Sequence, residues 1–255
     1  MTWTTPGLLQ QAIVATFVVL SLPSDAAELL ILSAGAVKSP LSVIAESYQK
    51  QTSHKLNVEY APVGVIVKAL AGGAMPDVII VTTDVIDDTE RKGWILPGLS
   101  VALGSVGVGV AVQELAPAPD ISSPEALKQT LLNAKSITYM NPEKGTSGKH
   151  FAEVLRRLGI AEQMKSKTTL GESGFIMEPV ARGEIEIGVQ QITEILPVRG
   201  AKLVGPLPAA LQKITTYIAA LGAHAHEANE AKNFLAYLGG EEAKVEFNKK
   251  GFAAP

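Results

Sequence analysis

"AELLILSAGAVKSPLSVIAESYQKQT", residues 27–52, decides the fold class of this chain. Its apolar beginning predicts a buried strand that ends on small residues at Ala34 and Gly35. Ser39 and Pro40 then suit the N-cap and first position of a helix, because serine can cap it and proline needs no hydrogen-bonded N–H there. The helix carries one apolar stripe at the spacing of successive turns, formed by Leu41, Ile44, Ala45 and Tyr48. The stretch therefore predicts a strand followed at once by a helix, with only small residues at the junction.

The same alternation continues as far as residue 93. Alternating apolar residues predict a half-buried strand at 55–61, and a continuous apolar run predicts a fully buried strand at 76–83. Helical spacing predicts helices at 63–71, stopped by two glycines, and at 84–92. The order strand, helix, strand, helix, strand, helix predicts an α/β fold with a parallel sheet.

Two later apolar strands are long enough to cross between two halves of the chain, at 105–112 and 214–221. We therefore expect one lobe formed by residues 27–106 together with 215–255, and a second lobe formed by residues 107–214. Helical spacing beyond residue 113 predicts helices at 123–133, 146–159, 227–238 and 241–250, and a short or bent helix at 172–183 around Pro179.

The N-terminus differs from the rest of the chain. Residues 12–22, "AIVATFVVLSL", form an apolar run too short to span a bilayer, which needs about 20 residues. Ser24 and Ala26 follow at the spacing of a signal-peptidase site, although residues 1–11 contain no Lys or Arg. We expect a signal peptide at residues 1–26, a periplasmic location and no membrane insertion after cleavage; the alternative is a buried N-terminal helix.

Composition excludes several functions. The formal net charge of −3 and the lack of basic-aromatic clusters argue against nucleic-acid binding. The absence of cysteine excludes disulfides, thiolate metal sites and cysteine nucleophiles. His224 and His226 are the only closely spaced histidines, and we interpret them as part of an exposed loop, so no metal site is expected. No phosphate-binding or dinucleotide-binding motif occurs, so no cofactor is expected.

Three turns between a predicted strand and a predicted helix consist largely of small or hydroxyl-bearing residues, at 34–39, 141–148 and 171–174. Helix N-termini present unpaired N–H groups and the positive end of the helix dipole, so they hold anions. In open α/β sheets, ligands bind beyond the carboxyl ends of the strands. We expect these turns to form an anion site from Ala36, Val37, Lys38, Thr146, Ser147, Gly148, Ser173 and Gly174.

Other residues point to the same site. Lys38 places a positive charge in the first turn of a helix, where it opposes the helix dipole unless an anion accompanies it. Gln190 and Gln191 end an apolar strand, and their amides can bind ligand oxygens. A purely structural alternative stays open, since Thr146 and Ser147 could only cap a helix and the glutamines could form a polar sheet edge.

Candidate acid and base groups are few. A proton-transfer isomerase needs only one or two such groups beside residues that hold a carboxylate. If the chain is such an enzyme, its candidate catalytic residues are Lys38, Tyr139, His150 and Glu194. The sequence favours a binding protein and leaves catalysis open.

Over residues 28–252 the chain resembles the molybdate-binding-protein family of periplasmic solute-binding proteins. The resemblance rests on the segments "LSAGAVKSPLSVIAESYQKQTSHKLNVEYA", "LAGGAMPDVIIVTTD", "YMNPEKGTSGKHFAEVLRRLG" and "EIGVQQITEI". It implies a two-lobed periplasmic-binding-protein fold of type II, in which each lobe is a mainly parallel sheet flanked by helices and two crossings form a hinge. It also implies closure over a small ligand that is passed to an ABC permease, and we expect a monomer.

The resemblance also implies where this site departs from the family. The family has a serine after its first strand, where this chain has Ala36, and a serine-rich turn where it has Val63 and Gly64. A family tyrosine corresponds to Gln191, whereas the turn at Ser147 is retained. Loss of hydroxyl donors weakens the binding of a tetrahedral dianion, so an organic carboxylate suits the site better than molybdate.

Three functions follow from this comparison. The first is an exported solute-binding protein for a small carboxylate, with Gly64 and the turn residues as its ligand contacts. The second is an isomerase similar to bacterial aconitate isomerases, which share the scaffold and shift a proton and a double bond in an unsaturated tricarboxylate. The third is a sensory or scaffold domain whose closure is read by a receptor.

Overall fold

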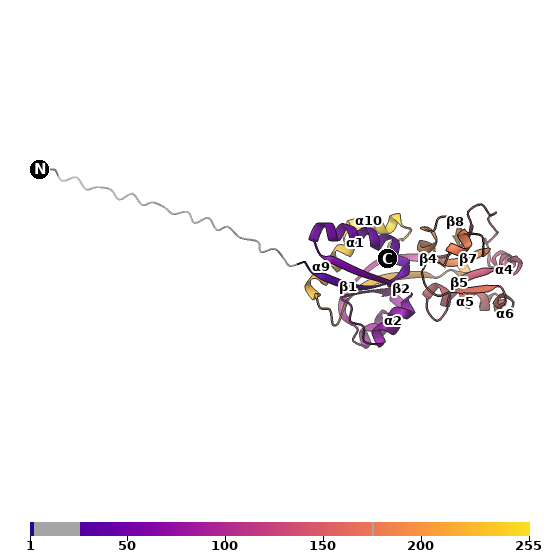
Figure 1. Cartoon of the computed structure of the whole chain (residues 1–255), viewed down its shortest axis with the longest axis horizontal. Helices are drawn as coiled ribbons and strands as arrows, with labels where there is room; N and C mark the ends of the chain where they lie inside the picture. The colour runs from indigo at the N-terminus through magenta and orange to yellow at the C-terminus, as the bar shows by residue number, and fades with distance from the viewer. Residues whose placement is uncertain (3–25, 175) are drawn as a thin grey trace.

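The computed structural model describes residues 1–2, 26–174 and 176–255 of the 255-residue chain. The chain forms two lobes joined side by side, each a sheet flanked by helices (Figure 1). The predicted signal peptide lies, apart from residues 1–2 and 26, outside the described residues. Within those described ranges, no helix combines the length and the apolar character needed to cross a membrane.

The first lobe begins with the predicted alternation of strands and helices. β1 pairs in parallel with β2 and β3, and every residue of β3 is buried, as its continuous apolar run predicts. α1 and α10 lie on one face of the sheet and α2 lies on the other (Figure 1). The elements are β1 (Glu28–Ala34), η1 (Gly35–Val37), α1 (Lys38–Thr52), β2 (Lys55–Ala61), α2 (Val63–Ala71), β3 (Val78–Thr82), α3 (Thr83–Arg91), α9 (Ala228–Leu238) and α10 (Glu241–Lys249).

The predicted N-cap of the first helix is wrong. α1 begins at Lys38, and Val37 occupies the N-cap position without a side-chain cap. The chain already turns at Gly35 into the 3-10 helix η1, so Ser39 falls inside the first turn instead of before it. Pro40 also lies in that first turn, where the helix needs no N–H donor.

Two antiparallel strands connect the lobes, β4 (Ile95–Gln113) and β9 (Ile214–Gly222), while β8 (Ala201–Pro206) pairs with the second-lobe part of β4. β4 pairs with β9 as far as Gly107 and with β7 and β8 from Val108 onward. The strand order β2-β1-β3-β9-β4-β7-β5-β6 is therefore continuous through β4, with β8 paired to β4 off this path. The parallel pairs lie to either side of these antiparallel strands.

The second lobe repeats the arrangement of the first. β5 pairs in parallel with β6 and β7, and the N-cap of α4 is Ser123 as predicted, its side chain accepting the N–H of Ala126 at 3.1 Å. The predicted helix at 172–183 is reduced to four residues, because Pro179 is tolerated only in a first turn. The elements are α4 (Pro124–Asn133), β5 (Ile137–Met140), α5 (Thr146–Arg157), α6 (Ala161–Lys165), β6 (Thr168–Gly171), α7 (Glu178–Ala181), β7 (Ile187–Gln191), α8 (Ile192–Ile195) and the 3-10 helix η2 (Ala209–Leu211).

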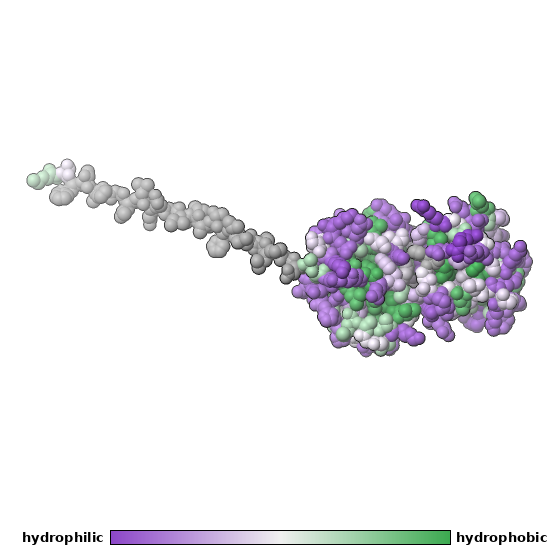
Figure 2. Space-filling view, in the orientation of Figure 1, coloured by the Kyte–Doolittle hydropathy of each residue, from purple (hydrophilic) through white to green (hydrophobic). Residues whose placement is uncertain are grey.

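Each lobe has its own hydrophobic core. One buried cluster takes its residues from 29–106 and 217–252, and a second takes its residues from 108–211. Hydrophilic residues cover much of the outer rim of both lobes (Figure 2). Separate cores allow the lobes to move against each other as units, which a single shared core would oppose.

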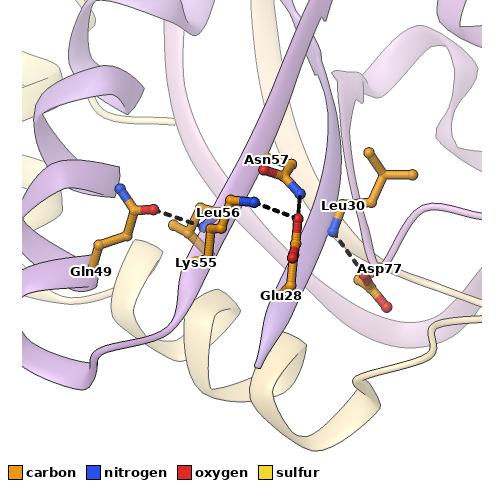
Figure 3. Close-up of polar contacts among 7 residues, drawn as sticks. All are labelled: Glu28, Leu30, Gln49, Lys55, Leu56, Asn57 and Asp77. Atoms are coloured by element: carbon orange, nitrogen blue, oxygen red, sulfur yellow. Dashed lines mark hydrogen bonds and ion pairs between the residues drawn. The ribbon is translucent and has the colours of Figure 1, made fainter. Parts of the chain in front are cut away.

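Polar side chains fasten the first lobe toward the amino-terminal ends of its strands (Figure 3). The buried Asp77 carboxylate accepts the N–H groups of Leu30, at 2.8 Å, and Glu227, at 3.0 Å. The Gln49 side-chain oxygen accepts the N–H of Leu56 at 2.8 Å, which ties α1 to β2. These bonds leave the carboxyl ends of the strands available for a site.

Candidate functional site

A cavity of about 120 Å³ lies between the lobes, where the carboxyl ends of β1, β2, β5 and β7 meet. This is where ligands bind in open α/β sheets, because the loops that follow the strands converge there. Its lining residues are Ala34, Gly35, Ala36, Lys38, Tyr60, Ala61, Pro62, Val63, Met140, Gly145, Thr146, Ser147, Gly174, Gln191, Glu194 and Tyr217.

Several helices begin at the cavity wall. α1 follows η1 at Lys38, α2 starts at Val63, and α5 starts at Thr146 with Gly145 as its N-cap. None of these three helices has a side-chain cap, so backbone N–H groups of their first turns are left to other partners. Helix N-termini from both lobes thus give the cavity a positive character that suits an anion.

Lys38 supplies the positively charged side chain among the lining residues. Its ammonium group lies 5.6 Å from the centre of the Tyr60 ring, a cation–π distance. Burial is the main cause that raises the pKa of Tyr60 above its ordinary value, so the phenol stays neutral and can donate a hydrogen bond. The two side chains together form one polar wall of the cavity.

Glu194 also lines the cavity. Burial raises the pKa of its carboxyl group from 4.5 to about 8, although a hydrogen bond with the Gln190 side chain acts in the opposite direction, so at neutral pH the protonated form is favoured and can donate a hydrogen bond. Burial, together with the neighbouring Glu194, raises the pKa of Tyr217 well above its ordinary value. A neutral acid and a neutral phenol beside an anion avoid the repulsion that an ionised carboxylate would cause.

The two glutamines lie side by side in sequence but only one reaches the cavity. Gln191 is buried and lines the cavity, with its Nε2 donating to Thr215 Oγ1 at 3.3 Å. Gln190 is also buried, and its Nε2 donates to the Gly174 carbonyl at 3.4 Å. Gln190 therefore supports the turn at Gly174, while Gln191 faces the ligand space.

The structure brings together six of the predicted ligand contacts. Ala36, Lys38, Thr146, Ser147, Gly174 and Gln191 all line the cavity, as does Glu194 from the candidate catalytic set. The other predicted contacts do not line it: Val37, Gly64, Gly148, Ser173 and Gln190. Buried Val37 belongs to the core of the first lobe, and Gly148 packs against the end of β5.

Two of the candidate catalytic residues lie elsewhere. Tyr139 is in the core of the second lobe, with its ring 5.1 Å from that of Phe151. His150 borders a second interlobe cavity, and its Nε2 is 2.8 Å from the Leu211 carbonyl oxygen. Burial lowers the pKa of His150, so its neutral form is favoured there. Lys38 and Glu194 are thus the two candidates that line this cavity.

Gly64 joins the lobes. Its N–H donates to the Lys144 carbonyl at 2.9 Å, and a Cβ at residue 64 would lie 2.8 Å from that oxygen. The sequence could not reveal this contact, because it depends on how closely the lobes approach each other. The bond links the start of α2 to the turn before α5 on the rim of the cavity.

Gly64→Ala is therefore expected to hold the lobes apart and weaken ligand binding by about tenfold or more, which corresponds to a loss of about 1.4 kcal/mol. The fold itself should be retained, because the clash arises only between lobes. Isothermal titration of the variant and of the wild type with an anion that binds the wild type measures the change in affinity. Val65→Ala, at an exposed neighbouring position, is the control, and equal affinities of the two variants would contradict this role for Gly64.

Several residues that line the cavity could not be identified from the sequence. Tyr60 lies near the end of β2 and Tyr217 lies within β9, and the apolar pattern of both strands predicts only core residues there. Met140 is likewise predicted only as a buried strand residue. Across residues 26–174 and 176–255, no group of three or more His, Asp or Glu residues is placed to hold a metal ion.

Comparison with known proteins places this architecture in a family. The profile of the family "Bacterial extracellular solute-binding protein" matches residues 29–253. An aconitate isomerase from Pseudomonas sp. is 30% identical over 229 residues, covering 88% of this chain and 86% of that protein. The molybdate-binding protein ModA of Azotobacter vinelandii is 26% identical over 190 residues, covering 73% of this chain and 72% of that protein.

Solved structures agree on the fold. The periplasmic molybdate-binding protein of Azotobacter vinelandii superimposes with a TM-score of 0.75 at 19% identity, covering 89% of this chain and 99% of that one. A periplasmic thiamin-binding protein superimposes with a TM-score of 0.73 at 12% identity, covering 90% of this chain and 83% of that one. With a matching profile over nearly the whole chain and the two-lobed fold of periplasmic binding proteins, the chain belongs to the bacterial extracellular solute-binding protein family.

Proposed function

We propose that this protein is an exported binding protein that captures a small organic carboxylate between its lobes for an ABC importer. The observation that carries the proposal is the interlobe cavity, which combines Lys38 and uncapped helix N-termini with neutral donor side chains. An anion there gains charge-assisted hydrogen bonds that a neutral solute cannot make. The family supports the proposed class of protein, and the lining of the cavity supports the proposed class of ligand.

A carboxylate suits the cavity better than a tetrahedral oxyanion such as molybdate. Part of the wall is apolar, formed by Ala34, Ala36, Ala61, Pro62, Val63 and Met140. An oxyanion has no carbon atoms to place against such a wall and needs hydrogen-bond donors on every side. A short carbon skeleton covers the apolar wall, while its carboxylate groups reach Lys38 and the start of α5.

We further propose that binding closes a hinge between a lobe of residues 27–106 with 215–255 and a lobe of residues 107–214. One boundary falls where β4 changes its pairing partners, and the other falls where the chain enters β9. Closure would complete the cavity, because its walls come from both lobes. A signal peptide at residues 1–26 would direct the chain to the periplasm, where such a protein meets its permease.

A thermal-shift panel tests the ligand class. It contains citrate, cis- and trans-aconitate, succinate, molybdate, tungstate, sulfate and phosphate. A ligand present at about 100 times its dissociation constant adds about 2.7 kcal/mol of stability, which raises the melting temperature measurably. We expect stabilisation by at least one di- or tricarboxylate. Stabilisation by molybdate or tungstate alone would contradict the proposal.

Lys38→Ala is expected to weaken binding of the carboxylate that the panel identifies by about tenfold or more, since the variant loses a charge-assisted contact in the cavity. Isothermal titration measures the change. Lys50→Ala removes a lysine from the other end of the same helix, where it pairs with Glu46 on the exposed surface, and should bind as the wild type does. Unchanged affinity in Lys38→Ala would exclude this lysine from the site.

A second candidate function is isomerisation of an unsaturated tricarboxylate. The 30% identical relative is an aconitate isomerase, and Glu194 places a carboxyl group with a pKa of about 8 in the cavity, well suited to moving protons near neutral pH. In such a reaction a base takes a proton from the methylene carbon, the double bond moves by one position, and a proton returns to the former alkene carbon. Atoms and electrons balance without any cofactor.

Proton NMR of trans-aconitate incubated with the protein separates the two candidates. An isomerase converts the trans signals into cis signals until equilibrium is reached, and exchanges methylene protons for deuterium in heavy water. Glu194→Gln should then bind trans-aconitate without converting it. An unchanged spectrum with bound trans-aconitate would leave the protein as a binding protein only.

A further inference from the structure

Glu194 occupies a position where the two lobes meet. It lies on α8, which follows β7 of the second lobe and also packs against η1 of the first. Its Oε1 lies so close to Gly35 that a Cβ added there would be 3.1 Å away. The small residue at the end of β1 therefore makes room for a carboxyl group from the other lobe as well as for a ligand.

A buried oxygen of Gln191, which lines the cavity together with Glu194, lacks a hydrogen-bond partner. Among the described residues, Gln191 Oε1 is one of four buried side-chain atoms left without a partner, and Gln191 lines the cavity at 2% exposure. A buried acceptor without a donor costs about 1–3 kcal/mol, so a ligand that supplies a donor would be favoured. Protonated Glu194 offers a donor to the same space. The Gln191 oxygen, as an acceptor, and the Glu194 carboxyl group, as a donor, are together complementary to a ligand group that can share a proton with them.

Few other ionisable groups face Glu194. β4, β7 and η1, which pack against α8, contain no ionisable side chain within their bounds. Lys202 of β8 donates to the Ala116 carbonyl at 2.7 Å, away from the cavity. Tyr217 of β9 and Lys38 at the start of α1 share the cavity with Glu194. Titration of the site between neutral and moderately alkaline pH is therefore attributed to Glu194.

We propose that the cavity binds its carboxylate together with one proton, which is held between the Glu194 carboxyl group and a ligand oxygen. This inference rests on the proposed function and adds the chemistry by which the ligand is selected. Below the pH at which Glu194 ionises, the residue brings the proton itself. Above that pH the proton comes from solvent, so no bond other than O–H forms or breaks. Glu194 is then a specificity residue that favours anions able to share a proton.

Isothermal titration with citrate and with trans-aconitate tests the inference in two buffers of different ionisation enthalpy. Wild-type protein should take up almost no proton on binding at about pH 7 and close to one proton at about pH 9.5. Its dissociation constant should be flat up to about pH 8 and then rise by about tenfold per pH unit. The two buffers give the number of protons directly, without any variant.

Glu194→Gln keeps a neutral hydrogen-bonding side chain of the same shape. It should bind with an affinity that does not change between about pH 7 and about pH 9.5 and should take up no proton. Glu162→Gln changes a carboxylate that pairs with Lys165 on the exposed surface and should behave as wild type.

The outcomes separate this inference from the proposed function. Wild-type binding with a flat pH profile and no proton uptake would overturn the inference while leaving carboxylate capture intact. A pH slope that persists in Glu194→Gln would overturn the assignment to Glu194. Failure of every carboxylate to bind the wild type would overturn the proposed function, and the inference with it.

Discussion

Glu194→Gln is expected to make the protein more stable than wild type at pH 8.5 by up to about 5 kcal/mol, and to leave stability nearly unchanged at about pH 4. The folded protein holds the Glu194 proton until about pH 8, whereas the unfolded chain releases it near the ordinary pKa of 4.5. Between these values the folded state binds more protons, so the free energy of unfolding falls as pH rises. At a pH above both pKa values, the free energy of unfolding has fallen by the full amount. Glutamine never ionises and avoids this loss.

Urea unfolding of both proteins at about pH 4 and about pH 8.5 measures this effect, which is the change with pH in the difference between their free energies of unfolding. Groups other than Glu194 titrate equally in the two proteins and cancel. Glu162→Gln, on the exposed surface of α6, should differ from wild type by the same small amount at both pH values. If Glu194→Gln and wild type show parallel pH profiles, Glu194 is ionised in the folded protein and its proposed role as a donor is wrong.

Gly148→Ala is expected to destabilise the protein by about 3 kcal/mol, because a buried overpacked site cannot relax when the obstructing atoms belong to the backbone. A Cβ at residue 148 would lie 1.9 Å from the Met140 carbonyl oxygen and 2.6 Å from its carbon. The end of β5 would have to separate from α5. Displacement of α5 would also move Thr146 and Ser147 out of the cavity wall, so affinity for an anion should fall as well.

Thermal unfolding measures this effect, with an expected fall of about 10 °C in the melting temperature. Gly205→Ala is a matched control in the same lobe, because a Cβ there would make only an ordinary contact, 3.7 Å from Ile121 Cδ1. Equal melting temperatures for the two alanine variants would show that α5 and β5 are not packed as closely as described.

Local patterns predicted the fold well where a single pattern fixes an element. The buried run in β3, the stripe along α1 and the glycines after α2 each settle an element without help from the rest of the chain. The two-lobed α/β class followed from their order and from the resemblance. The start of α1 was predicted less well, because backbone geometry at Gly35 decides it, whereas Pro179 correctly indicated that α7 is short.

The site was only partly predictable. Turns of small residues identified Ala36, Lys38 and Ser147, since the chemistry of a helix N-terminus is visible in sequence. Tyr217 and the cavity-facing side of Glu194 were not, because β9 and α8 reach the cavity only through long-range pairing. The small residues at the end of β1 have two proposed roles. The sequence could indicate the first, which is to give an anion access to the helix N-terminus. It could not indicate the second, which is to make room for the Glu194 side chain.

If a carboxylate binds between the lobes at the starts of α1 and α5, a crystal structure of the protein with the tightest-binding carboxylate of the panel will show it there. We expect carboxylate oxygens within about 3.2 Å of the Lys38 ammonium group and of a backbone N–H at the start of α5, with Glu194 at hydrogen-bond distance from the same ligand. A carboxylate bound outside this cavity, or within it but out of reach of both lobes' helix N-termini, would show that the proposed binding site is wrong.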